Sequence, residues 1–252
     1  REGVKAAPPS LAALQRMSQT TTSAALKTLD IVKEADVVFL ALHGGQGEDG
    51  TIQAVLDLMG VVYTGSGHVA SALAMDKDLA KHLMRVHGVP TPDWLMAPAS
   101  VADVQGQMGF PVVVKPSKQG STVGLAVVKD PAHLDAAIKE ASLYDDEVII
   151  ERFIAGRELT VGVLGDRVLP VGEIIPRHEI YDYECKYTAG MAREEFPAKL
   201  TQKETVEVQK LALAAFRALK LRGYARIDFR MANDGTFHCL EANTLPGLTQ
   251  LS

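Results

Sequence analysis

The feature that most constrains the fold is a pair of runs near the end of the sequence, YARIDFRM at 224–231 and TFHCLEAN at 236–243. The residues between them, Asn-Asp-Gly at 233–235, are the types that a tight connection between antiparallel strands requires. We therefore predict a β-hairpin. Because a long helix is predicted just before it, this part of the chain mixes sheet and helix and does not follow a purely parallel alternation.

That helix begins with a capping box. Thr201 is followed three residues later by Glu204, and each can satisfy a free backbone N–H at the first turn. Apolar residues then recur at helical spacing. The predicted buried face consists of Val208, Leu211, Ala212, Ala215 and Leu219.

Short apolar runs alternate with amphipathic segments along the rest of the chain. The run DVVFLAL at 36–42 reads as a buried strand that ends at a Gly-rich loop, a pattern typical of α/β proteins. The same criteria predict helices at 51–59, 69–86 and 131–144, and strands at 61–65, 111–115, 124–129, 147–153, 159–165 and 167–175. The fold class is therefore α/β and α+β.

Composition excludes several classes of protein. The 252 residues carry 26 Lys plus Arg against 31 Asp plus Glu, and no apolar run reaches the roughly 20 residues of a membrane span. We expect no membrane and no nucleic-acid partner, because phosphate backbones need clustered basic residues. Cys185 and Cys239 are the two cysteines, without zinc-ligand spacing, so a reducing, cytoplasmic location is expected. The first residue is Arg1 and the last follows a motif-rich stretch directly, so we expect a fragment.

The predicted hairpin brings together residues that could hold a divalent cation. Side chains two positions apart on a strand share a face, so Arg226 lies beside Asp228, and Glu241 lies beside Asn243. Two carboxylates and an amide oxygen are hard ligands that suit Mg²⁺ bound to a nucleotide. The alternative is an edge hairpin with solvated charges, and the spacing alone does not decide. The turn that follows, at 243–247, aims backbone N–H groups into the same region, where they could hold an oxyanion.

Two further segments are candidates for ligand binding. KPSKQGSTVG at 115–124 is not a Walker A loop, but its glycines, hydroxyls and Lys115 could hold phosphate; the alternative is a flexible hairpin loop. HGGQGEDG at 43–50 follows a predicted strand, where open α/β sheets place ligands, although its His could equally be structural. A third segment, YDYECKY at 181–187, is either a substrate contact or an ordinary polar loop.

Taken in order, HGGQGEDG, YTGSG with SALAMDK, KPSKQGSTVG, IERFIAGRELTVGVL, YDYECKY, ARIDF and LEANTLPG resemble the bacterial D-alanine–D-alanine ligases of the ATP-grasp superfamily, over residues 36–252. The resemblance implies an ATP-grasp fold in which ATP lies between two α+β subdomains. It also implies that one D-alanine is phosphorylated by ATP and attacked by the amine of a second, to give the dipeptide used in peptidoglycan synthesis. The implied parts are a partial N-terminal α/β domain at 1–66, a central subdomain at 67–149, and a C-terminal subdomain with the metal site at 150–252.

For ATP, the resemblance implies lysines at the phosphates and a mixed set around the adenine and ribose. The phosphate residues are Lys77, Lys115 and Lys186, and the adenine and ribose residues are Glu151, Phe153, Ile154 and Glu158. Two Mg²⁺ ions, with Mn²⁺ as an alternative, are implied at Asp228, Glu241 and Asn243.

For the D-alanines, the resemblance implies roles in binding, charge stabilisation and closure. Arg226 and the Gly247 N–H would stabilise the tetrahedral oxyanion, and His43 would lie near the first D-alanine carboxylate. Ser252 would bind the second D-alanine, and Ser121 with Tyr187 would close the site. Tyr187 also favours an amine nucleophile, because ligases that make D-alanyl-D-lactate generally replace it.

Other implications concern the assembly and the chain ends. A homodimer is expected, and the polar segments 117–123 and 182–196 are candidate lids. The first strand of the family, its substrate-binding Glu and a C-terminal helix have no counterpart here, so we expect this exact chain to be unstable or weakly active. The alternatives are another ATP-grasp carboxylate–amine ligase and a nucleotide-binding fragment without catalysis; Asp228, Glu241 and Asn243 argue against the second.

Overall fold

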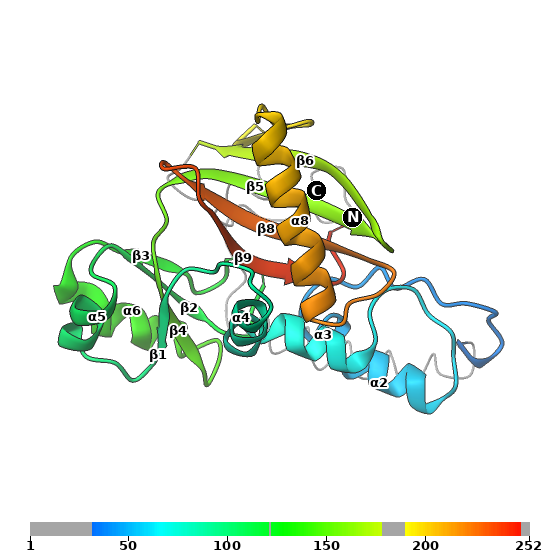
Figure 1. Cartoon of the computed structure of the whole chain (residues 1–252). Helices are drawn as coiled ribbons and strands as arrows, with labels where there is room; N and C mark the ends of the chain where they lie inside the picture. The colour runs from blue at the N-terminus through cyan, green and yellow to red at the C-terminus, as the bar shows by residue number, and fades with distance from the viewer. Residues whose placement is uncertain (1–31, 121, 178–189, 248–252) are drawn as a thin grey trace.

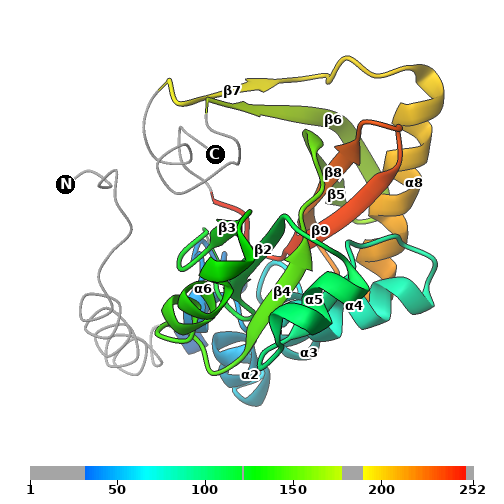
Figure 2. The ribbon, with the colours of Figure 1, turned by 90° about the vertical axis from the view of Figure 1, so that its left-hand side faces the viewer.

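The computed structural model describes residues 32–120, 122–177 and 190–247. Within them, two antiparallel sheets lie beside each other, one of four strands in the order β1-β4-β2-β3 and one of five in the order β7-β6-β5-β8-β9 (Figures 1 and 2). The mixed α/β and α+β class predicted from the sequence is confirmed. Among the helices of these residues, none is both long and apolar enough to cross a membrane.

The small sheet is covered by helices on one face. Its strands are β1 (Trp94–Met96), β2 (Val112–Pro116), β3 (Ala126–Val128) and β4 (Val148–Arg152). Val112, Val114, Val148 and Ile150 point toward α5 (Val101–Gln107) and α6 (Leu134–Ala141), which follows the 3₁₀ turn η2 (Pro131–His133). Since side chains alternate along a strand, Val113, Lys115 and Glu151 point to the opposite face.

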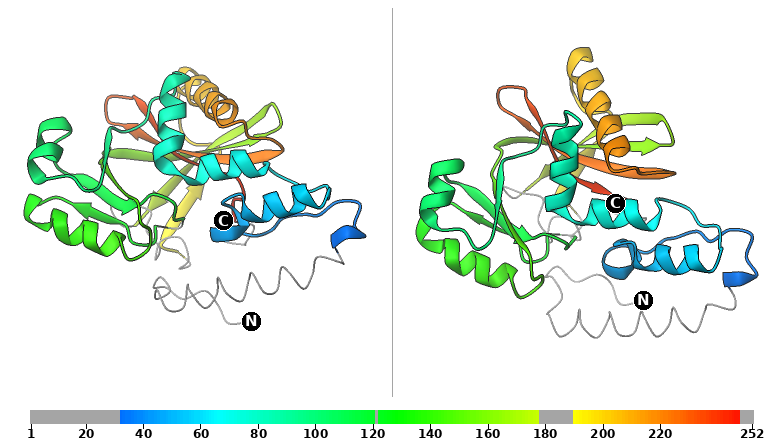
Figure 3. Two further views of the ribbon diagram at one scale, coloured as in Figure 1. Left: turned by 90° about the horizontal axis from the view of Figure 1, so that it is seen from below. Right: turned by 60° about the horizontal axis from the view of Figure 1, so that its bottom comes forward.

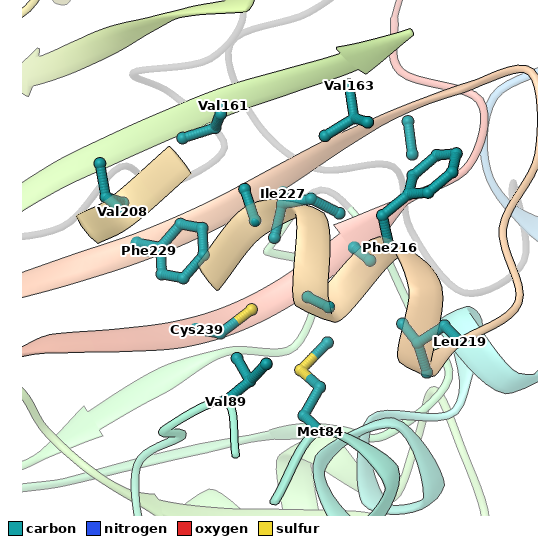
Figure 4. Close-up of a cluster of buried hydrophobic side chains, with 14 of the residues drawn as sticks. Met84, Val89, Val161, Val163, Val208, Phe216, Leu219, Ile227, Phe229 and Cys239 are labelled. Carbon is teal, nitrogen blue, oxygen red and sulfur yellow. The ribbon is translucent and has the colours of Figure 1, made fainter. Parts of the chain in front are cut away.

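The large sheet is built in the same way. Its strands are β5 (Gly156–Leu164), β6 (Arg167–Pro176), β7 (Ala192–Glu195), β8 (Tyr224–Ala232) and β9 (Phe237–Asn243). Helix α8 (Gln202–Ala218) packs on one face over a core that contains Val161, Ile227, Phe229 and Cys239 (Figure 4). The predicted hairpin is confirmed, as is the capping box of α8, whose Thr201 and Glu204 exchange hydrogen bonds. Of its predicted buried face, Leu211 is only half-buried.

The single helix predicted at 69–86 is wrong, because the segment forms two helices. They are α3 (His68–Met75) and α4 (Lys77–Val86), which run in different directions (Figure 3). Asp76 between them is extended, with φ −79° and ψ 102°, and its carboxylate accepts a hydrogen bond from the Leu79 N–H. An Asp side chain that caps a new helix offers the backbone an alternative to continuing the old one.

The strands predicted at 36–42 and 61–65 are also wrong as continuous elements. Among the described residues, this region contains one isolated parallel bridge, between Val38 and Tyr63. Apolar runs predict a strand only when a neighbouring strand satisfies their backbone groups, and the bridge satisfies few of them. The short turn η1 (Gly45–Gly47) and α2 (Thr51–Leu58) follow 36–42 and precede α3. Gly50, in the left-handed region with φ 95°, begins α2, and a Cβ there would collide with the His68 carbonyl oxygen.

Candidate active site

The uncovered faces of the two sheets enclose a cavity of about 120 Å³. One wall consists of β2, β4 and the loop at 116–125, and the other of β5, β6, β8 and β9. We call them the small-sheet wall and the large-sheet wall. Lys77, the first residue of α4, reaches the cavity between them.

The small-sheet wall is centred on a buried carboxylate. Glu151 Oε1 lies 2.8 Å from Lys115 Nζ and its Oε2 lies 2.6 Å from Lys81 Nζ. Lys115 and Glu151 meet because both point to the uncovered face of adjacent strands. Burial alone would raise the pKa of Glu151, but the positive charges of Lys115 and Lys81 outweigh it and hold that pKa at about 2. Glu151 is therefore ionised at neutral pH, while burial lowers the pKa of Lys81 and the charge of Glu151 opposes that shift.

Lys77 connects this wall to the other one. Its Nζ donates to the carbonyl oxygens of Gln119 at 2.7 Å and Ser117 at 3.3 Å, and it lies 3.5 Å from Glu241 Oε2. Burial lowers the pKa of Lys77, while Glu241 opposes the shift. For Lys115, burial is opposed by the charges of Glu151 and Glu241, and the net effect raises its pKa. Two ammonium groups thus face the cavity: Lys77 has two carbonyl partners and one carboxylate partner, and Lys115 is paired with Glu151.

The loop between β2 and β3 is fixed at its base. The Lys118 N–H donates to Asp145 Oδ2 at 2.6 Å, and Gln119 Nε2 donates to the Tyr144 carbonyl oxygen at 3.1 Å. Gly124, with φ 69°, packs so closely on the Tyr144 ring that a Cβ would lie 2.7 Å from it. The loop therefore begins and ends at defined positions beside Lys77 and Lys115.

On the large-sheet wall, the Arg226 guanidinium lies among acidic and polar side chains. Arg226 donates to both oxygens of Asp228, with Nε 3.1 Å from Oδ1 and Nη2 3.0 Å from Oδ2. Thr160 Oγ1 donates to Asp228 Oδ1 at 2.7 Å, and Asn243 Nδ2 donates to Oδ2 at 2.9 Å. The charge of Asp228 raises the pKa of Arg226 well above its ordinary value. Arg226, Asp228 and Asn243 thus converge, as the hairpin pattern predicts, and Glu241 lies opposite Asp228.

A β-bulge makes this convergence possible. Phe229 pairs with Cys239 but Asp228 pairs with Glu241, so β9 has one extra residue, Leu240, at this step. Before the bulge, Phe237 and Cys239 point into the core; after it, Ala242 does so, and Leu240 and Glu241 line the cavity. Without the bulge, simple alternation would place Glu241 and Asn243 on the same face as Cys239, away from the cavity.

Asp228, Glu241 and Asn243 fit a hard divalent cation by the chemistry of their donors. They offer carboxylate oxygens and, after rotation of the Asn243 amide, a neutral oxygen, which are the ligands that Mg²⁺ and Mn²⁺ prefer. Their carboxylates are now balanced by Arg226 and Lys77. No cluster of three or more His, Cys, Asp and Glu suited to a metal occurs in the described part of the chain, as expected for a set whose third member is an amide.

His43 lies beside the turn that follows β9. Its Nδ1 is 3.0 Å from the Leu245 carbonyl oxygen and 3.3 Å from Glu48 Oε2. The hydrogen bond to Glu48 raises the pKa of His43. Buried Glu48 also accepts hydrogen bonds from the N–H groups of Gly44 and Leu245, so it joins the Gly-rich turn to the turn that ends at Gly247.

The remaining predicted residues fall into two groups. Phe153, Ile154 and Glu158 line the cavity, and Arg230 joins them: its Nη1 donates to Glu158 Oε2 at 3.1 Å and its Nε to the Ile154 carbonyl oxygen at 3.1 Å. The predicted residues Ser121, Lys186, Tyr187 and Ser252 lie outside the described residues.

Sequence reasoning missed several residues of this site. Among them are Glu48, Lys81, Thr160 and Arg230. A signal existed for two of them: Lys81 stands four positions after Lys77, on the same face of a helix, and Thr160 stands opposite Asp228 in the sheet.

Comparison with known proteins places this geometry in a family. A sequence profile described as the D-ala D-ala ligase C-terminus matches residues 82–252, and one described as the D-ala D-ala ligase N-terminus matches residues 3–66. The D-alanine–D-alanine ligase of Geobacter sulfurreducens is 46% identical over 219 residues, which are 86% of this chain and 69% of that protein.

Two solved structures are similar over most of this chain. The D-alanine–D-alanine ligase of Bacillus anthracis complexed with ATP superposes with a TM-score of 0.79 at 34% identity, over 90% of this chain and 74% of that one. The VanG D-Ala:D-Ser ligase of Enterococcus faecalis superposes with a TM-score of 0.78 at 34% identity, over 86% and 66%. The chain thus spans about two thirds to three quarters of the length of these relatives. It belongs to the D-alanine–D-alanine ligase family and has the ATP-grasp fold.

Proposed function

We propose that the protein joins two D-alanines into D-alanyl-D-alanine, using ATP, as a step in the synthesis of peptidoglycan precursors. Family membership supports the reaction. The observation that supports it most directly is the cavity between the two sheets, where the ammonium groups of Lys77 and Lys115 lie across from carboxylates on the large-sheet wall, such as Asp228 and Glu241. A triphosphate with its cations is complementary to both.

The chemistry requires a leaving group on a carboxylate. A carboxylate is a poor electrophile at neutral pH, and transfer of the γ-phosphoryl group of ATP to the first D-alanine gives an acyl phosphate. The amine of the second D-alanine then attacks the acyl carbon, and phosphate leaves as the amide bond forms. The first step brings two anions together, so the site must supply positive charge.

Lys77 and Lys115 are proposed to supply that charge at the ATP phosphates, with Lys186 at the γ-phosphate. Both described lysines line the cavity and are held in place by partners. Two Mg²⁺ ions, or Mn²⁺, held by Asp228, Glu241 and Asn243 would add Lewis-acid stabilisation. Glu151, Phe153, Ile154 and Glu158 are proposed to border the adenine and ribose.

Around the D-alanines, Arg226 and the Gly247 N–H are proposed to stabilise the oxyanion of the tetrahedral intermediate. Arg226 is suited to this because its guanidinium lies in the cavity and is held by Asp228. His43, whose raised pKa favours the cationic form, is proposed to lie near the first D-alanine carboxylate. Ser252 is proposed to contact the second D-alanine, and Ser121 and Tyr187 to close the site.

The proposal extends to the organisation of the enzyme. The N-terminal part at 1–66, the central subdomain at 67–149 and the C-terminal subdomain at 150–252 would act together in a homodimer. A cytoplasmic location would supply the ATP that the reaction consumes.

The test is an assay of ADP release that depends on both D-alanine and Mg²⁺. We expect release with D-alanine, loss of release on chelation of the metal, and recovery on addition of Mg²⁺ or Mn²⁺. The substrate is identified by comparing ADP release in the presence of D-alanine with ADP release in the presence of D-serine, D-lactate or L-alanine. ATP binding without any D-alanine-dependent release of phosphate would contradict the proposal and favour a nucleotide-binding protein.

A further inference from the structure

Lys81 is a charged side chain buried beside Glu151 of the small-sheet wall, outside the lining of the cavity. It is 1% exposed and does not line the cavity, although Lys77, one helical turn earlier on α4, does. Its Nζ lies 2.6 Å from Glu151 Oε2 and donates to the Pro92 carbonyl oxygen at 3.1 Å. A buried ammonium carries a large desolvation cost, so its presence calls for a role.

The position of Lys81 is fixed on every side. Its Nζ lies 5.1 Å from the centre of the Trp94 ring, and Trp94 Nε1 donates to Asp78 Oδ1 at 2.6 Å, which holds the ring against α4. These contacts hold the ammonium beside Glu151, and it cannot turn into the cavity without losing Glu151 and Pro92. Lys81 therefore contacts the lining of the cavity through Glu151 and acts on a bound anion by its charge.

Glu151 distributes its charge between two lysines. One oxygen faces Lys81 and the other faces Lys115, so two ammonium groups share a single carboxylate. If Lys115 were its only partner, the two charges would cancel and the wall would present an ion pair with no net charge to an anion. With Lys81 present, one positive charge remains in excess, and Lys115 is the lysine of the pair that lines the cavity.

We infer that Lys81 is a positioning residue for nucleotide binding: it balances and orients Glu151, so that Lys115, although paired with Glu151, keeps an excess of positive charge that attracts an ATP phosphate. The inference rests on the proposed function, in which the cavity binds ATP. The low pKa of Glu151, to which both lysines contribute, agrees with a shared carboxylate.

The direct test is Lys81→Met, which keeps the apolar stem and removes the charge. The Kd for ATP, measured by calorimetry on the whole chain without D-alanine, should rise on the order of ten- to thirtyfold. That is the effect of one elementary charge across about 8–12 Å at an effective dielectric constant of about 20. In steady state, the KM for ATP should rise by a similar factor, while kcat and the KM for D-alanine change less than about twofold.

A conservative variant separates this role from a merely structural one. Lys81→Arg keeps the positive charge beside Glu151 and changes the shape of the side chain, so ATP affinity should stay within about threefold of wild type. Lys81→Gln removes the charge but can still donate a hydrogen bond, and its ATP affinity should fall as in Lys81→Met. The comparison of Lys81→Arg with Lys81→Gln still tests the inference if Lys81→Met does not fold.

Met84→Ala is the matched control, because Met84 is fully buried on the same helix and packs in the apolar core. It should destabilise α4 and leave ATP affinity within about twofold. Equal ATP affinity of wild type and Lys81→Met, an equal loss in Met84→Ala, or equal losses in Lys81→Arg and Lys81→Gln would each overturn the inference and leave the proposed function standing. A wild-type chain that binds no ATP would overturn the proposed function itself.

Discussion

At the small-sheet wall two ammonium groups, Lys81 and Lys115, are paired with one carboxylate, Glu151. On the large-sheet wall the Arg226 guanidinium is paired with Asp228, and a second acid, Glu241, lies beside them. The walls also differ in depth: the side chains of Lys81 and Glu151 are 1% and 3% exposed, but those of Arg226 and Glu241 are 30% and 25% exposed. Charges that are buried when the chain folds must be paired within the protein. Charges beside solvent can exchange a protein partner for a ligand. We therefore expect substitutions in the first wall to affect stability most, and in the second to affect activity most.

The largest effect is expected for Glu151→Ala, which leaves two buried ammonium groups without their carboxylate. Removing one partner of a buried pair costs about 3–5 kcal/mol, and here two pairs are lost, so the upper end applies. The free energy of unfolding from urea titration at pH 7 measures this. If the free energy of unfolding falls by less than about 1 kcal/mol, the charges of the small-sheet wall do not contribute to stability as expected.

Asp228→Asn is the complementary change on the large-sheet wall. It keeps the shape of the side chain and removes the charge that a metal would need, so kcat/KM for D-alanine-dependent ADP release should fall on the order of a thousandfold. The midpoint of urea unfolding should move much less than in Glu151→Ala. A variant with near wild-type activity and reduced stability would reverse the comparison.

The pKa of Glu151 predicts a pH dependence of stability. The folded-state value of about 2 lies below the ordinary value of 4.5, so the ionised carboxylate stabilises the folded state above pH 4.5, and this contribution is lost as the pH falls from 4.5 to 2. The difference in unfolding free energy between wild type and Glu151→Gln should therefore shrink by about 3 kcal/mol across that window. If the difference in unfolding free energy does not vary with pH, Glu151 is not held ionised by its two lysines.

Thr160→Val tests the support of Asp228. The change removes the hydroxyl that donates to Asp228 Oδ1 and keeps the volume of the side chain. Groups that orient a metal ligand are worth about 10- to 100-fold in metal affinity, so the Mg²⁺ concentration for half-maximal ADP release should rise by that factor. Thermal unfolding of the metal-free protein controls for a general loss of structure. An unchanged Mg²⁺ requirement would show that the Thr160 hydroxyl does not support Asp228 as a metal ligand.

The smallest effect is expected for Asp166→Ala. This change breaks a guanidinium–carboxylate pair of the same kind as Arg226 and Asp228, but at the surface. Asp166 lies 3.2 Å from Arg217, with the two side chains 89% and 64% exposed. Exposed pairs contribute little because water and salt screen them, so no measurable change in stability or activity is expected. A loss comparable to that of Glu151→Ala would show that burial is not what distinguishes the two walls.

Local chemistry made part of this structure predictable. The capping box of α8 and the turn of the last hairpin depend on neighbouring residues, and both form where the sequence indicates. The break at Asp76 was missed because the apolar periodicity continues through it, while the competing cap is a single side chain. The strands at 36–42 and 61–65 failed because a strand depends on its partner and not only on its own pattern.

Within the site, the same distinction applies. Asp228, Glu241 and Asn243 could be grouped by their spacing, yet the extra residue Leu240 that turns two of them toward the cavity leaves no mark in the pattern of apolar residues. Lys81 was missed because an isolated lysine on a helix reads as solvated. Its charge is balanced by Glu151, 70 positions later and on another element, which no local pattern indicates.

The short junction at Asp76 sets the rotational phase of α4. Lys77 and Lys81 lie on the same side of that helix, four residues apart. Successive residues of an α-helix are rotated by about 100° around its axis. One residue inserted or deleted between Met75 and Lys77 would swing both ammonium groups around the helix axis, away from Glu241 and Glu151 together. The spacing of this junction is thus constrained as strongly as the identity of the lysines, and tolerance to insertion should reach a minimum there.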